Sequence, residues 1–202
     1  SILPKNPACV TFSHNDLHAG NILHLKNTSD YLFIDCEYSG YNYRAFDIAN
    51  LFAETVFDYH YSEYPYYKVE EEAYPPQSEL KDFIRYYAFF KMFRADLTEV
   101  ESKSIIDDPK AMKQYLKASG KMAEFLQLLD QLMSEAIIGK MLSHYHWTIW
   151  SVTFSKKEGI EFDYIAYAYD RMKLYQKAKE EFLARRSKQK YDESEAAFSQ
   201  IH

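Results

Sequence analysis

The feature that most constrains this 202-residue chain is a pair of short strand patterns that directly follows a polar loop. Apolar and polar residues alternate over 21–25, an apolar run covers 31–34, and the polar turn 27–30 separates them. Such a pair of runs predicts a β-hairpin. Another strand is expected at 8–12, so residues 14–20 should form a loop that leads into the hairpin.

Most of the remaining sequence has helical periodicity. Phe46, Ala49 and Phe52 recur at three-residue spacing after Arg44, which predicts a helix. Further helices are expected from Ser78 as N-cap to Phe93, from the Asp108–Pro109 pair to about Ser155 with breaks allowed at Gly120 and Gly139, and from Phe162 to Arg185. A tyrosine-rich connection covers 58–76, and a polar tail is expected at 187–202. These patterns predict an α+β chain that is mainly α, in one compact unit.

Composition excludes several classes of protein. No run approaches the roughly 18 uninterrupted apolar residues of a membrane span, and the first residues do not resemble a secretory signal, so we expect a soluble, cytoplasmic protein. The net charge of −6 argues against a nucleic-acid partner and is compatible with a cationic substrate. Cys9 and Cys36 lie in apolar, strand-like runs, which predicts buried, reduced thiols. With 19 Tyr and 14 Phe, the chain has enough rings for an aromatic pocket.

The loop and the hairpin also carry the residues expected to do chemistry. Asp16 is followed five residues later by Asn21 and, fourteen residues after that, by Asp35, which is the spacing of a kinase catalytic loop. Phosphoryl transfer needs hard oxygen ligands for Mg²⁺ and an acceptor for the proton of the attacking hydroxyl. Asn21 and Asp35 are therefore the candidate metal ligands, and Asp16 the candidate base. Such a short match also occurs among ordinary loop residues, but the preceding His14 and the flanking strands favour catalysis.

Longer blocks of this sequence closely resemble the choline/ethanolamine kinase family. They are His14-Asn15-Asp16-Leu17 with Gly20-Asn21-Ile22-Leu23, the run Phe-Ile-Asp-Cys-Glu-Tyr-Ser-Gly-Tyr-Asn at 33–42, and Phe46-Asp47-Ile48-Ala49-Asn50 with Glu54. The stretches 146–151 and 160–164 resemble that family's last helices, so the resemblance covers about residues 9 to 183. Protein kinases have Asp-Phe-Gly and a later Ala-Pro-Glu; this chain has Asp35-Cys36-Glu37 and no Ala-Pro-Glu, so a protein substrate is not expected.

The resemblance implies a protein-kinase-like fold whose C-terminal lobe, with a small catalytic hairpin and a helical bundle, comprises residues 1–186. It implies transfer of the γ-phosphoryl group of ATP to the hydroxyl of choline, the first step of the CDP-choline route to phosphatidylcholine, with Mg²⁺ as cofactor. Leu23 and Ile34 would form the floor under adenine, and His14 and Asp47 would support the catalytic loop. The amino-alcohol site that it implies is an aromatic cage with a carboxylate, made by Tyr38, Glu54, Tyr59, Trp147, Trp150, Phe162 and Tyr167.

The chemistry of such a cage suits a quaternary ammonium, which has no hydrogen to donate. Ring faces and a nearby negative charge hold it, at about 0.5 to 2 kcal/mol for each desolvated cation–π contact. Trp147 and Trp150 would share a helix face. On spacing alone, however, a stripe of Trp and Tyr is better explained as core, and Glu54 could be a solvated helix residue. His144 and His146 should point to different faces of their helix, so a metal pair is not expected.

Several alternatives stay open at this point. Ethanolamine is the rival substrate, an aminoglycoside phosphotransferase is the rival enzyme, and a kinase-derived binding module is the non-enzyme alternative. A complete kinase also needs a glycine-rich phosphate cover and a strand lysine, whereas the five glycines here are isolated. We therefore expect the N-terminal ATP-binding lobe to lie outside this chain, in cis or as a separate fragment, with weak activity in its absence. His18 stands where many family members have Gln, and homodimers are common in that family.

Overall fold

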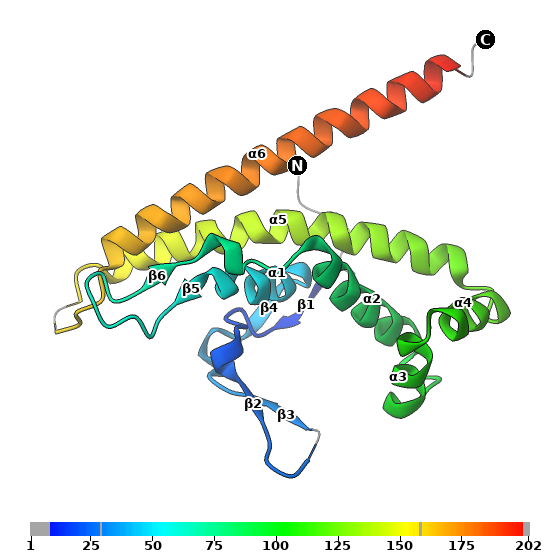
Figure 1. Cartoon of the computed structure of the whole chain (residues 1–202), viewed down its shortest axis with the longest axis horizontal. Coiled ribbons are helices and arrows are strands. Elements are labelled where there is room, and N and C mark those ends of the chain that lie inside the picture. Colours follow the sequence, from blue (N-terminus) through cyan, green and yellow to red (C-terminus); the bar gives the residue numbers. More distant parts are fainter. Residues whose placement is uncertain (1–8, 29, 158, 200–202) are drawn as a thin grey trace. The chain divides into compact units, whose positions relative to one another are not determined.

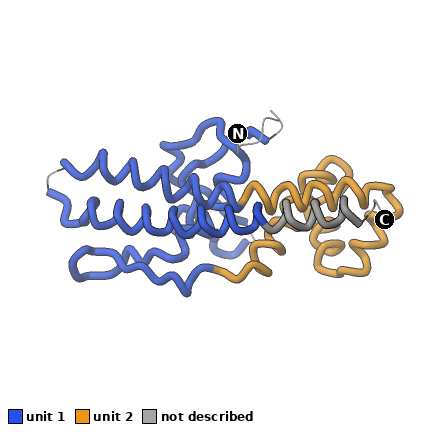
Figure 2. The backbone as a smooth tube through the Cα atoms, turned by 90° about the horizontal axis from the view of Figure 1, so that it is seen from above, with its two compact units in different colours: residues 1–74, 137–202 blue, residues 75–136 orange. Residues whose placement is uncertain are grey.

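The computed structural model describes residues 9–28, 30–157 and 159–199, with side chains up to residue 187 (Figure 1). The chain divides into two compact units, residues 1–74 with 137–202 and residues 75–136, where the sequence led us to expect one (Figure 2). The long helix α5 (Met122–Phe154) contributes residues to both. None of the described helices combines the length and the apolar character that a membrane span requires.

Two antiparallel ribbons frame the polar loop in the first unit. Strand β1 pairs with β4, and β2 pairs with β3; their bounds are Val10–Ser13, Gly40–Tyr43, Ile22–His24 and Tyr31–Phe33. The β2–β3 ribbon confirms the predicted hairpin. Strand β4 was not predicted, because its Gly-Tyr-Asn-Tyr sequence lacks the apolar alternation of a half-buried strand. Backbone pairing with β1 therefore defines it.

The helices of the first unit are α1 (Ala45–Ala53), the second half of α5, and α6 (Tyr164–Ser199). Helix α1 confirms the sequence prediction, and α6 continues past the predicted end at Arg185. No break occurs at Gly139: a Cβ there would lie 2.7 Å from the carbonyl oxygen of Ala45 and 2.8 Å from the Cβ of Ala49. This glycine thus lets α1 and α5 approach closely.

The aromatic core of this unit also includes a ribbon that the sequence did not reveal. Strands β5 (Phe57–Asp58) and β6 (Lys68–Val69) pair within the tyrosine-rich connection. They are too short to show a periodicity. The buried cluster beside them consists of Val56, Phe57, Tyr67, Trp147, Tyr167 and Leu174.

The two cysteines differ in burial. Both are free thiols, and Cys9 is buried as expected. Cys36 is exposed, so the prediction of a buried thiol was wrong there. The cause is local: Cys36 lies in a 3₁₀ turn, Cys36–Tyr38, and not in a strand.

The second unit is helical. It contains α2 (Gln77–Phe93), α3 (Glu99–Asp107), α4 (Pro109–Ala118) and the first half of α5. Asp108 caps α4 as predicted, by accepting a hydrogen bond of 2.8 Å from the backbone N–H of Lys110. The break at Gly120 is also confirmed, since this residue has a φ of +69° between α4 and α5. Helix α3, which starts at a capping box of Thr98 and Glu101, was missed.

Candidate active site

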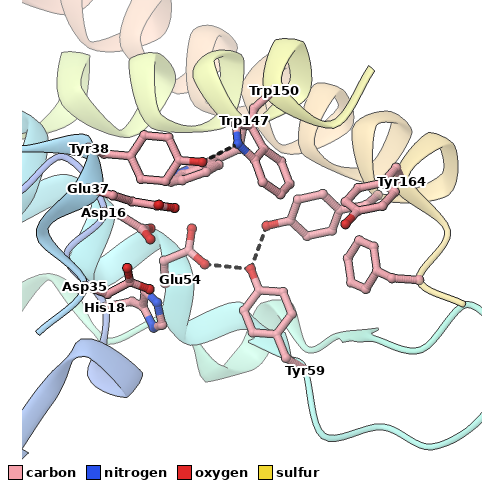
Figure 3. A pocket seen from close by; sticks show the side chains of 12 residues that line it. Asp16, His18, Asp35, Glu37, Tyr38, Glu54, Tyr59, Trp147, Trp150 and Tyr164 are labelled. Atoms are coloured by element: carbon pink, nitrogen blue, oxygen red, sulfur yellow. Dashed lines mark hydrogen bonds between the residues drawn. The ribbon is translucent and has the colours of Figure 1, made fainter. Parts of the chain in front are cut away.

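A cavity of about 520 Å³ opens in the first unit (Figure 3). This volume is typical of small-molecule sites. The residues that line it are Asp16, His18, Asp35, Glu37, Tyr38, Glu54, Tyr59, Trp147, Trp150, Phe162, Tyr164 and Tyr167. The structure thus brings all seven residues of the expected amino-alcohol site together with Asp16 and Asp35. The sequence had assigned no role to Glu37 or Tyr164.

The cavity has two chemically different ends. Figure 3 shows the carboxylates of Asp16, Asp35 and Glu37 on one side, which we call the carboxylate end. Tyr59, Trp147, Trp150 and Tyr164 lie on the other side. Phe162 and Tyr167 pack against Tyr59 there, and we call these six residues the aromatic end. Glu54 lies between the two ends.

At the carboxylate end, α1 holds the loop that carries Asp16. The carboxylate of Asp47, in the first turn of α1, accepts hydrogen bonds from the backbone N–H groups of His14 at 2.7 Å and Asn15 at 2.8 Å. Asn15 has a φ of +68°, in the left-handed region, where a non-glycine residue persists only when its surroundings enforce it. These contacts fit the support of the loop that the resemblance implied for Asp47.

His14 connects the same loop to the residue before Asp35. Its Nδ1 lies 3.3 Å from the backbone nitrogen of Asp16, and its Nε2 lies 2.8 Å from the carbonyl oxygen of Ile34. Because Nδ1 accepts from a backbone N–H, Nε2 must carry the hydrogen and donate a hydrogen bond to the carbonyl oxygen of Ile34. These two contacts therefore fix the position of Asp16 relative to the end of β3.

The donor set of Asn21 and Asp35 fits a hard cation. The Nδ2 of Asn21 donates to the carbonyl oxygen of Asp16 at 3.0 Å and to its Oδ2 at 3.4 Å. The two heavy atoms of an amide point apart, so Oδ1 of Asn21 faces away from Asp16. Asp35, with a φ of +60°, makes no side-chain cap to the turn that follows it. One amide oxygen and one carboxylate are ligands that suit Mg²⁺, which keeps several of its water or phosphate ligands.

The protonation of Asp16 is set by its surroundings. Burial raises the pKa of Asp16 to about 6. The negative charges of Glu54 and Asp35 act in the same direction, whereas the charge of His18 opposes them. A carboxylate with a pKa near neutral pH can accept a proton from a substrate hydroxyl and release it afterwards.

Three asparagines support the site without having been assigned a role from the sequence. The side chain of Asn15 donates to the carbonyl oxygen of Tyr38 at 2.8 Å and accepts from Asn42 at 2.9 Å. The buried Asn50 donates to the carbonyl oxygen of Leu17 at 3.1 Å, and its Oδ1 accepts from Trp147 at 2.8 Å and from Ser143. Asn50 therefore links the loop that carries Asp16 to α5. The only sequence signal for these residues was their place in the resembling blocks.

At the aromatic end, rings from α5, α6 and the β5–β6 connection meet. Trp147 and Trp150 pack edge to face, with centroids 5.4 Å apart. The indole N–H of Trp150 donates to the hydroxyl of Tyr38 at 2.9 Å. Trp147 and Tyr167, at 6% and 3% exposure, belong to the buried core and also line the cavity. Core packing and pocket lining, which the sequence presented as alternatives, thus apply to the same rings.

Glu54 is not the solvated residue that the sequence allowed, because only 8% of it is exposed. It forms an ion pair with Arg171 of α6, whose side chain is fully buried. Desolvation would lower the pKa of Arg171, but Glu54 and the hydroxyls of Tyr167 and Tyr59 raise it above its usual range. Arg171 was missed, because a single arginine in a charged helix carries no sequence signal. Its Nη1 also lies 3.2 Å from Nδ1 of His144.

The two residues predicted to lie under adenine are outside the set that lines this cavity. Leu23 lies opposite Leu32 in the β2–β3 ribbon. The backbone N–H of Ile34 donates to the carbonyl oxygen of Asn21 at 3.0 Å, which extends the pairing by one step. Because faces alternate along each strand, Leu23, Leu32 and Ile34 share one face of the ribbon. Their contact with adenine stays a prediction.

Comparison with known proteins identifies the family. A family model described as choline/ethanolamine kinase matches residues 2–176. A choline/ethanolamine kinase of Rattus norvegicus is 34% identical over 178 residues, which cover 87% of this chain and 39% of that protein. Ethanolamine kinase 1 of Mus musculus is 32% identical, covering 87% and 40%.

A solved structure gives the same result. The crystal structure of a choline kinase from Cryptosporidium parvum Iowa II matches with a TM-score of 0.58 at 25% identity, covering 87% of this chain and 40% of that one. The chain thus spans about two fifths of the length of these relatives. On the family match and the sequence identities together, the chain belongs to the choline/ethanolamine kinase family.

Proposed function

We propose that this chain carries the catalytic and amino-alcohol-binding parts of a kinase that transfers the γ-phosphoryl group of ATP to the hydroxyl of choline. The observation that carries the proposal is the two-ended cavity. A carboxylate with a raised pKa, Asp16, shares one space with a set of aromatic rings. A short amino alcohol has the matching two ends, a hydroxyl and a cation.

In this reaction Asp16 accepts the proton of the choline hydroxyl as the oxygen attacks the γ-phosphorus. The bond between that phosphorus and the bridging oxygen of ATP breaks, so the products are phosphocholine and ADP. The transition state is loose, so the main contributions of the protein are the position of the hydroxyl and the charges around the transferred group. Asp47 and His14 contribute by hydrogen bonds that keep the loop with Asp16 in position.

Asn21 and Asp35 would hold Mg²⁺ in this proposal. When bound, the ion would neutralise charge that develops on the phosphate oxygens. The support is the donor set: one amide oxygen turned away from Asp16, and one carboxylate not used in capping its own turn.

The aromatic end favours choline as the substrate. The ring faces of Trp147, Trp150 and Tyr59 can surround a quaternary ammonium that offers no hydrogen bond. Ethanolamine is the second candidate, since the similar proteins include both choline and ethanolamine kinases. The family match and the abundance of rings both favour an amino alcohol over an aminoglycoside.

The nucleotide would lie against the ribbon face that carries Leu23 and Ile34. Leu23 and Leu32 are 43% and 49% exposed, so an apolar surface is available for adenine. We propose that the phosphate cover and its lysine belong to an ATP-binding lobe outside these 202 residues, since the sequence contains no Gly-x-Gly pair.

The test is a product assay by ³¹P NMR with ATP, Mg²⁺ and either choline or ethanolamine. It compares this chain with the enzyme extended at its N-terminus. We expect phosphocholine from the extended enzyme, little from this chain, and none from extended Asp16→Ala. If the extended enzyme phosphorylates neither amine, the proposed function is wrong and the chain is a binding module.

A further inference from the structure

Arg171 packs against the rings of the aromatic end, close to the place proposed for the positively charged ammonium of the substrate. Its guanidinium carbon lies 3.9 Å from the ring centroid of Phe57 and 4.9 Å from that of Tyr167. The side chain is fully buried. It donates to Glu54, Tyr59 and Tyr167, three of the residues that line the cavity.

The directions of the hydrogen bonds in this cluster follow from Arg171 and Glu54. Arginine only donates, so the hydroxyl oxygen of Tyr167 accepts from Nε at 2.8 Å and also from Nη2. Because Tyr59 donates its own hydrogen bond to Glu54, the hydroxyl of Tyr167 must donate a hydrogen bond to the hydroxyl oxygen of Tyr59, 2.6 Å away. Tyr59 in turn donates to Oε2 of Glu54 at 2.7 Å, while Nη2 of Arg171 donates to Oε1. The hydrogen bonds thus run from Arg171 through Tyr167 and Tyr59 to Glu54, and the direct contact between Arg171 and Glu54 closes the circuit.

This circuit uses the polar atoms that a bound ammonium would otherwise reach. Each oxygen of Glu54 already accepts one of the two hydrogen bonds that it can take, and the carboxylate charge is balanced by Arg171. The hydroxyls of Tyr59 and Tyr167 each use their hydrogen in a hydrogen bond within the circuit, and each oxygen accepts from Arg171. What these two tyrosines still offer to a ligand is the surface of their rings.

The consequence differs between ammonium groups. A primary ammonium has three N–H donors and loses hydration on burial unless it finds acceptors. A quaternary ammonium has no N–H donor, so ring faces are sufficient for it. The carboxylates of Asp16, Asp35 and Glu37 lie at the opposite end of the cavity, where the hydroxyl must be to react.

We propose that Arg171 is a positioning residue that makes the site select a quaternary over a primary ammonium, because it balances the charge of Glu54 and donates to the hydroxyls of Tyr59 and Tyr167. This inference rests on the proposed function, because it concerns the same amino-alcohol pocket. It assigns substrate preference to a residue that does not touch the substrate.

Binding to the chain itself can test this, because its two tryptophans, Trp147 and Trp150, both line the cavity. Intrinsic tryptophan fluorescence therefore reports on this pocket. The titrants are ethanolamine, its N-methyl and N,N-dimethyl derivatives, choline, and the neutral analogue 3,3-dimethylbutan-1-ol. The measured quantity is the ratio of the Kd for ethanolamine to the Kd for choline.

In Arg171→Gln the carboxylate of Glu54 becomes available, and we expect the ratio to fall by about tenfold, the effect of one charged hydrogen bond. The double variant Arg171→Gln/Glu54→Gln should restore most of the original ratio, because no free carboxylate is left. Arg171→Lys, which keeps the charge beside Glu54, should stay close to the original ratio. Arg186→Gln, an exposed arginine on the same helix, is the matched control.

Tyr167→Phe keeps the ring and frees an acceptor on Tyr59, so it should lower the ratio by about threefold with little risk to folding. Circular dichroism establishes that each variant is folded. If Arg171→Gln does not fold, Tyr167→Phe and Arg171→Lys decide the question.

The outcomes separate the two proposals. A ratio that is unchanged in Arg171→Gln and Tyr167→Phe, or an equal loss of affinity for both amines, overturns the role of Arg171 and leaves the kinase proposal intact. If no amine changes the fluorescence of the original chain while the neutral alcohol does, the amino-alcohol pocket itself is wrong.

Discussion

The two ends of the cavity are built in different ways. The carboxylate end lies on a loop and two short ribbons. Asp47 accepts from two backbone N–H groups of the loop, His14 bonds to the backbone before Asp35, and Asn15 and Asp35 are both left-handed. The aromatic end lies between helices α5 and α6 and is held by ring packing around the buried Arg171. The first end depends on local geometry, and the second on contacts between residues far apart in sequence.

This difference separates two tasks. A group that moves a proton must be held within a fraction of an ångström, which rigid hydrogen bonds achieve. A group that recognises a cation needs area and polarisable faces, which a core supplies. Substitutions at the carboxylate end should therefore lower kcat, whereas those at the aromatic end should raise KM.

The largest effect is expected for Asp16→Asn in the N-terminally extended enzyme. Loss of the general base should lower kcat by about 10³-fold, with KM for choline changed less than about threefold. Steady-state kinetics with choline and ethanolamine provide the measurement, and Asp30→Asn, in the exposed turn of the hairpin, is the control. A rise in KM as large as the fall in kcat would contradict the division between the two ends.

A smaller loss is expected for Asp47→Asn, which cannot accept from both backbone N–H groups of the loop. The loop should lose its defined position, and kcat should fall by about 10- to 100-fold while KM for choline is kept. The same kinetic assay measures it, with circular dichroism as the check on folding. An unchanged kcat would show that the loop does not need α1.

At the aromatic end, Trp150→Leu removes one wall of the cage and the hydrogen bond to Tyr38. We expect KM for choline to rise by about tenfold with kcat nearly unchanged, since a desolvated cation–π contact contributes about 1 to 2 kcal/mol. Trp150→Phe keeps a ring and should show a smaller rise. Loss of kcat in both variants would mean that this end also positions the reacting hydroxyl.

The pH dependence should reflect the raised pKa of Asp16. Only the ionised carboxylate accepts a proton, so log kcat/KM should fall on the acid side with an apparent pKa of about 6. The kcat profile should bend at lower pH, because bound cations stabilise the carboxylate. An acid limb near the ordinary value of 3.8 would show that burial does not affect this group.

The smallest effect concerns stability. A carboxyl whose pKa is raised in the folded state stabilises the fold when protonated, and this stabilisation is lost as pH rises through about 6. At neutral pH the charged Asp16 is therefore unfavourable. Asp16→Asn should raise Tm by about 2 to 4 °C at pH 7.5, from about 1 kcal/mol after solvent screening, but not at pH 4. Calorimetry at both pH values measures it, and a lower Tm at pH 7.5 would contradict the argument.

The contrast between local geometry and contacts distant in sequence also explains what the sequence could predict. The hairpin, α1, α2 and the capped start of α4 follow from local alternation, helical spacing and cap chemistry, and all of them are present. The carboxylate end was also readable, because Asp16, Asn21 and Asp35 lie within one short motif. Strands β4 and β5–β6 were missed, because pairing and not periodicity defines them.

At the aromatic end, sequence reasoning stopped at residue types. It identified the rings, through the family resemblance, but treated Glu54 as a free carboxylate. Its partner Arg171 is 117 residues away, and no local pattern connects two such positions. The sequence also left open a break at Gly139, because the residues that its missing side chain accommodates, Ala45 and Ala49, are distant in the chain.

Gly139 lies where the helices that carry the two ends of the cavity, α1 and α5, touch each other. Alanine normally favours a helix interior over glycine by about 1 kcal/mol, yet here an added methyl would press on the backbone of Ala45 and the Cβ of Ala49. Helix α1 bears Asp47 and Asn50, and α5 bears Trp147. A methyl group at Gly139 would therefore push α1 and α5 apart, and with them Asp47 and Trp147.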